Sequence, residues 1–178
     1  MEENGFPSWI RAVDVIVGVI SVVAAVLFVI GNSLSNFVLI FVLSASLVAV
    51  AFARVARAAA VKAKGAPRRA VNLISGAVVL ILVAVVFFVS GLSEVLQIRL
   101  IASAWLIMGV ARILIGILEN DVQRNLRISQ FIVGIISIAI SIYIDLSPSI
   151  DITTAVLFLA LVVGSNGLAR TARGYVGV

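Results

Sequence analysis

The chain has 178 residues, and its 63% hydrophobic content and mean hydropathy of +1.28 exclude a water-soluble globule, which is usually about half apolar. It has no cysteine and no histidine, which excludes disulfides, thiolate nucleophiles, imidazole acid–base chemistry and the commonest soft metal sites. The net charge of +5 comes from basic residues beside apolar segments, so it indicates membrane topology and not nucleic-acid binding.

Six apolar runs are each long enough to cross about 30 Å of hydrocarbon as a helix. In chain order, the predicted spans cover residues 12–30, 36–55, 70–89, 95–117, 127–145 and 152–170. A transmembrane β-barrel needs alternating polar and apolar residues, whereas the run 77–89 is apolar throughout. Because backbone groups in lipid must bind one another, we predict an all-α membrane protein with six transmembrane helices.

Basic residues are distributed unevenly about these spans. Twelve of the thirteen Lys and Arg residues fall on one side of a six-span chain, and only Arg99 falls on the other. Positive charge near span ends is held on the cytoplasmic side, so we expect a plasma (cytoplasmic) membrane protein with both termini in the cytoplasm. The first run could instead be a cleavable signal peptide, but it follows Glu2 and Glu3 and not a basic segment.

A gapless repeat of 58 residues runs through the chain, and it brings Arg11 onto Arg69 and then onto Arg127. Each unit contains two spans, so successive units enter the membrane from the same side and are parallel copies, not inverted ones. We therefore expect three tandem helical hairpins around a pseudo-threefold axis. They form a single transmembrane domain over residues 1–178, with units of about 5–62, 63–120 and 121–178.

A basic residue, a polar residue and a glycine recur in the first helix of each unit, at separations of three and four that place them on one helix face. With the arginine that recurs in the second helices, they predict a polar cluster at the cytoplasmic end: Arg11, Asp14, Arg54, Arg69, Asn72, Arg112, Arg127, Gln130 and Arg170. Small residues let helices approach closely in lipid, and we expect helix packing at Gly18, Gly76, Gly134, Ala51, Gly109 and Gly167.

The ionisable members of this cluster have two interpretations each. Asp14 could relay protons with Arg11 or Arg54, but the equivalent residues Asn72 and Gln130 cannot titrate, so an interhelical polar contact is preferred. Arg54 and its two repeat equivalents could form a ring that binds anionic lipid headgroups or closes a pore. Alternatively, they could extend towards the membrane surface and fix the depth of each helix.

Residues near the opposite ends of the spans have structural interpretations. Ser35, Ser93 and Asp151 align in the repeat at the start of each second helix, where a side-chain oxygen caps free backbone amides. We expect Arg99 to form a salt bridge with a carboxylate on that side. Trp105 lies deep in its span and is expected to pack in the interior.

The unit has an arginine at the start of its first span, a glycine about two turns later, a short outer turn, and a second span such as Ala104–Ile113 (AWLIMGVARI) that leads into a basic turn. This pattern resembles the HdeD-like family, small bacterial and archaeal membrane proteins with three copies of a two-helix repeat. The resemblance implies a six-span inner-membrane protein, linked in enterobacteria to acid resistance and without known catalytic residues. The absence of histidine here excludes histidine-based pH sensing.

The sequence contains no paired carboxylates, phosphate-binding glycine loop or metal-ligand cluster, so we expect no catalytic, cofactor or metal residues and no enzymatic activity. We expect a non-enzymatic membrane protein, either an HdeD-like stress-tolerance factor or an accessory subunit of a membrane complex. Its expected partners are the lipid bilayer, anionic headgroups and either other membrane proteins or further copies of itself. The alternative is a channel or small-solute transporter, which needs a polar lining, and the membrane midplane offers little beyond Ser44, Ser46, Ser103 and Asn166.

Overall fold

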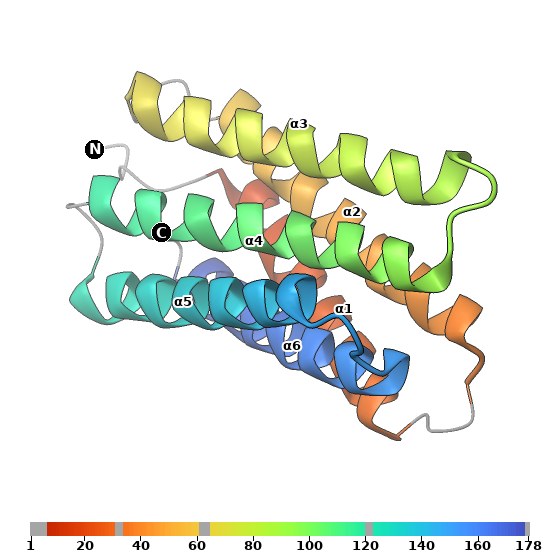
Figure 1. Cartoon of the computed structure of the whole chain (residues 1–178). Coiled ribbons are helices and arrows are strands. Elements are labelled where there is room, and N and C mark those ends of the chain that lie inside the picture. The colour runs from red at the N-terminus through yellow and green to blue at the C-terminus, as the bar shows by residue number, and fades with distance from the viewer. Residues whose placement is uncertain (1–6, 31–33, 61–64, 120–122, 177–178) are drawn as a thin grey trace, which may run out of the picture.

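The computed structural model describes residues 7–30, 34–60, 65–119 and 123–176. These residues form six α-helices, each long and apolar enough to cross a membrane, so the chain is a multi-pass membrane protein. The helices are α1 (Ser8–Ile30), α2 (Asn36–Ala60), α3 (Ala66–Phe88), α4 (Glu94–Leu118), α5 (Arg124–Leu146) and α6 (Ile152–Val176). Figure 1 shows that α1 begins and α6 ends at the same end of the bundle, which we call the basic end.

The predicted spans coincide with the six helices, and every helix is longer than its predicted span, α2 and α6 by the most. α2 continues to Ala60 and α6 to Val176, beyond the predicted ends at 55 and 170.

The predicted caps are confirmed at the start of the second helix of each unit. The oxygens of Ser35, Ser93 and Asp151 accept hydrogen bonds from backbone amides three residues later, at 3.5, 3.3 and 3.1 Å.

Three helices form the interior of the bundle and three lie outside them. α2, α4 and α6 contact one another, and half or more of the apolar span of each is buried, against one third for α1, α3 and α5. The most extensive helix contacts are α1 with α6, α2 with α3, and α4 with α5. Each of these contacts therefore joins the first helix of one hairpin to the second helix of another.

Large apolar side chains fill the centre of the bundle and also cover its outside. Leu43, Trp105 and Leu159 are fully buried where the inner helices meet, and the predicted packing role of Trp105 is confirmed. Outward-facing side chains such as Ile74 and Leu168 are more than half exposed. An apolar exterior of this kind suits a bilayer, because lipid tails and not water surround it.

Small residues lie where the helix backbones approach most closely. A Cβ added to Gly167 would lie 2.7 Å from the carbonyl oxygen of Gly18, and one added to Gly109 would lie 2.8 Å from that of Gly134. The third contact has Gly76 against Ala51, with a corresponding distance of 2.9 Å. Side chains at these positions would force the helices apart, and such overpacking typically costs about 1–3 kcal/mol.

Candidate functional site

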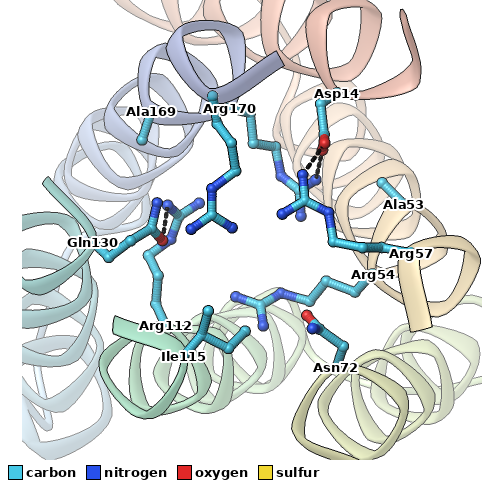
Figure 2. A pocket seen from close by; sticks show the side chains of 11 residues that line it. Asp14, Ala53, Arg54, Arg57, Asn72, Arg112, Ile115, Gln130, Ala169 and Arg170 are labelled. Atoms are coloured by element: carbon cyan, nitrogen blue, oxygen red, sulfur yellow. Dashed lines mark hydrogen bonds and ion pairs between the residues drawn. The ribbon is translucent and has the colours of Figure 1, made fainter. Parts of the chain in front are cut away.

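Polar side chains from all six helices converge inside the basic end of the bundle (Figure 2). We call this site the arginine chamber. It is lined by Asp14, Arg54, Arg57, Asn72, Arg112, Gln130, Arg170 and Arg173, with Ala53, Ile115 and Ala169 between them. The three inner helices contribute the five arginines, and the three outer helices contribute the carboxylate and the two amides.

The positions of the arginines follow from the repeat and from helix geometry. Arg54, Arg112 and Arg170 are 58 residues apart, and they are only 5%, 3% and 7% exposed. Three residues further along the inner helices, on the same face, lie Arg57 and Arg173, while α4 has Ile115 at the equivalent position. Five guanidinium groups therefore gather within about one helical turn.

Asp14 forms ion pairs with two arginines of the chamber. Its two carboxylate oxygens accept from different helices: Oδ1 from Arg170 Nη1 of α6 at 2.9 Å, and Oδ2 from Arg57 Nη2 of α2. A further ion pair joins Arg173 Nη2 to Glu119 Oε2, at the end of α4, at 2.6 Å. These contacts tie α1, α2, α4 and α6 together at the basic end.

Arg54 and Arg112 are bound only by neutral groups among the described residues. Arg112 Nη1 donates to Gln130 Oε1 at 2.9 Å, while Arg54 donates to Ser75 Oγ at 3.4 Å and to the carbonyl oxygen of Met108 at 3.3 Å. The Nε atoms of Arg54, Arg112, Arg170 and Arg173 are buried and have no hydrogen-bond partner in the part of the chain that the structure describes. Four guanidinium donors of the chamber are therefore unused among the described residues.

Positive charge exceeds negative charge in the chamber. Five guanidinium groups line the chamber, whereas the described carboxylates beside them are those of Asp14 and Glu119, and neither forms an ion pair with Arg54 or Arg112. At an effective dielectric constant of about 20, two like charges about 6 Å apart repel each other by about 3 kcal/mol. Guanidinium groups stay protonated and only donate hydrogen bonds, so the chamber is suited to holding negative charge.

The structure brings together six residues of the predicted polar cluster: Asp14, Arg54, Asn72, Arg112, Gln130 and Arg170. The three arginines of the first helices do not join them, which corrects the prediction. Arg11 and Arg69 are exposed, and Arg127 is half buried and donates through Nε to the carbonyl oxygen of Gly116 at 3.2 Å. At the start of a helix, a long arginine side chain can turn towards the membrane surface, where its charge stays hydrated. Arg11 therefore does not line the chamber beside Asp14.

Three charged residues of the site were missed by the sequence analysis: Arg57, Arg173 and Glu119. The predicted spans ended at residues 55 and 170, because the basic residues beyond them were interpreted as the membrane boundary. The spacing of three from Arg54 to Arg57, and from Arg170 to Arg173, would have placed them on the same helix face.

The opposite end of the bundle has fewer polar contacts. Arg99 Nη2 donates to the carbonyl oxygen of Ser147 at 3.1 Å, and no ion pair of Arg99 with a carboxylate is present among the described residues, so the expected salt bridge is wrong. Asp145 instead accepts from Ser103 Oγ at 3.2 Å. Among the residues that the structure describes, no group of three or more Asp, Glu, His or Cys could hold a metal ion.

Comparison with known proteins gives no relatives: no family model matches the chain, and neither a curated protein nor a solved structure is significantly similar to it. The resemblance to the HdeD-like family therefore depends on the repeat pattern alone.

Replacing Asp14 by Asn tests its role as the shared counterion of Arg57 and Arg170. Removing one partner of a buried ion pair leaves uncompensated charge, so we expect Asp14→Asn to lower the free energy of unfolding by about 3–5 kcal/mol. Chemical denaturation of the purified protein in detergent micelles measures the change. The matched control is Asp151→Asn, at an exposed helix cap, which should cost about 1 kcal/mol or less. Equal losses in the two variants would contradict the role assigned to Asp14.

Proposed function

We propose that the protein is a non-enzymatic integral membrane protein that acts through its basic end, either as an HdeD-like stress-tolerance factor or as an accessory subunit of a membrane complex. The observation that supports this proposal is that the buried charged side chains, among the described residues, all lie at one end of a largely apolar bundle. Stable co-purification with another membrane protein in mild detergent would favour the accessory subunit, and purification alone would favour the stress-tolerance factor.

A packed interior favours this function over a channel or transporter. Beyond the chamber, Leu43, Leu47 and Trp105 are fully buried between the inner helices. Two of the four polar residues that could have lined a path bind to their own helix. Ser46 Oγ donates to the carbonyl oxygen of Leu43 at 2.7 Å, and the amide of Asn166 donates to the carbonyl oxygen of Val162 at 2.8 Å. These contacts support a closed bundle without a polar path from end to end.

We also propose that the three hairpins are equivalent units around an approximate threefold axis. The gapless 58-residue repeat supports this arrangement, as do the three contacts between hairpins and the mutual contacts of α2, α4 and α6. Two contacts inside the chamber follow the same pattern. Arg54 donates to the carbonyl oxygen of Met108, and Arg170 donates to that of Val50, which is the repeat equivalent of Met108.

The orientation that we propose places the basic end in the cytoplasm. It is supported by the ten described arginines at that end, against Arg99 at the other: Arg11, Arg54, Arg57, Arg68, Arg69, Arg112, Arg124, Arg127, Arg170 and Arg173. Because the chain has no natural cysteine, single cysteines can report on the two ends separately.

A matched pair of serine substitutions tests this orientation. Ser8→Cys lies at the exposed start of α1, and Ser149→Cys lies in the exposed turn between α5 and α6. In intact cells, a membrane-impermeant maleimide should label Ser149→Cys, while Ser8→Cys should react only after the membrane is permeabilised. The reverse pattern would place the basic end outside the cell.

Flux measurements test the choice between a closed membrane protein and a transporter. Because apolar side chains fill the centre of the bundle, proteoliposomes should pass potassium, chloride and phosphate no faster than protein-free liposomes do. An ionophore added at the end of each trace verifies that the vesicles are sealed. A saturable flux that depends on the protein would reject the proposed function and favour the transporter class.

A further inference from the structure

We propose that the arginine chamber is a binding site for a phosphate group, presented either by a free phosphate ion or by the headgroup of an anionic lipid. This goes beyond the function proposed above, which needs no ligand. It depends on the excess of buried positive charge, on the unused donors of the chamber, and on its position at one end of the bundle.

The first step is the charge that lacks a partner. Arg54 and Arg112 are almost fully buried, and no described carboxylate forms an ion pair with either of them. Their Nε atoms, like that of Arg170, are buried without a hydrogen-bond acceptor among the described residues. Buried charges in proteins are normally paired, so a negatively charged group belongs between these side chains.

The second step is the chemistry of the donors. A guanidinium group is a planar fork of N–H groups that matches the oxygens of a phosphate, and it can bind two of them at once. In Figure 2, the guanidinium groups of Arg54, Arg57 and Arg170 point towards a common space, with the amide of Asn72 beside Arg54. A phosphate monoester has a charge of about −1.5 to −2 at neutral pH, which balances the excess better than a chloride ion does.

The third step is access. The cavity among the side chains has a volume of about 20 Å³, which is room for about one water molecule. A phosphate group therefore enters only when the guanidinium groups move apart, which their flexible stems permit. Ser75 accepts a hydrogen bond from Arg54. Together with Ile74 and Val110, it also lines an apolar groove between α3 and α4 on the lipid-facing side of the bundle. This groove could hold an acyl chain next to the chamber, so both sources of phosphate can reach the site.

Titration of the delipidated protein in detergent tests the free ion. At constant ionic strength, replacing chloride by inorganic phosphate should raise the unfolding temperature of the wild type in a saturable way, because a ligand that binds only the folded state stabilises it. Arg112→Gln should weaken the apparent affinity by about tenfold or more, as expected for a lost charged hydrogen bond. The matched control is Arg69→Gln, an exposed arginine at the same end, which should change the affinity by less than about twofold.

Nanodiscs test the lipid source. The protein is placed in phosphatidylcholine with or without phosphatidic acid, and the lipids that stay bound are counted by native mass spectrometry. Retention of phosphatidic acid, reduced in Arg112→Gln and unchanged in Arg69→Gln, would assign the site to a lipid headgroup. Saturable stabilisation by inorganic phosphate without such retention would assign it to the free ion.

The proposal is overturned if neither phosphate nor phosphatidic acid binds more tightly than chloride or phosphatidylcholine. Equal weakening by Arg69→Gln and Arg112→Gln would also overturn it, because the binding would then be general attraction to a basic surface. If Arg112→Gln does not fold, Arg54→Gln replaces it, and the preference of the wild type for phosphate over chloride still decides. The flux experiment is independent of these results, so the failure of one proposal leaves the other testable.

Discussion

The contact between α1 and α6 is the constraint on which the rest of the structure depends. Helices in a bilayer gain little from hiding apolar surface, so they associate through close backbone packing and polar contacts. Both are present here: Gly18 lies against the backbone of Gly167, and one turn away Asp14 accepts from Arg170. Because the first and last helices meet, the bundle closes, and the arginines of the inner helices surround one interior space.

The cost of burying charge in a bilayer accounts for the position of the buried charges at one end of the bundle. A charged side chain at the bilayer centre is costly, and that cost falls towards the membrane surface. The five arginines lie in the last turns of α2, α4 and α6, while the centre of the bundle is filled by side chains such as Leu47 and Trp105. The apolar body thus holds the inner helices together, and the arginine chamber is where charged hydrogen-bond donors gather inside the bundle.

The sequence predicted the helices, their caps and much of the chamber, because these depend on local periodicity and on the repeat. It could not predict where the helices end, since a basic residue beyond an apolar run looks the same whether the helix stops or continues. Arg57 and Arg173 were missed for this reason, and Arg11 was misplaced because spacing alone does not show where a long side chain turns at a helix start. The pair of Asp14 with Arg170 joins residues 156 positions apart, which no local pattern can show.

Disulfide cross-linking in native membranes most directly tests the central claim, that three equivalent hairpins close around the chamber. A Cβ added to Gly164 lies 3.1 Å from the Cβ of Ala25, close enough that a small shift would permit a disulfide between cysteines there. Under mild oxidation, three repeat-equivalent cysteine pairs should all form intramolecular links: residues 25 with 164, 83 with 48, and 141 with 106. The control pair of residues 25 and 141 should not, because α1 and α5 are not in contact. Links in the first pair alone, or in the control pair, would contradict the account.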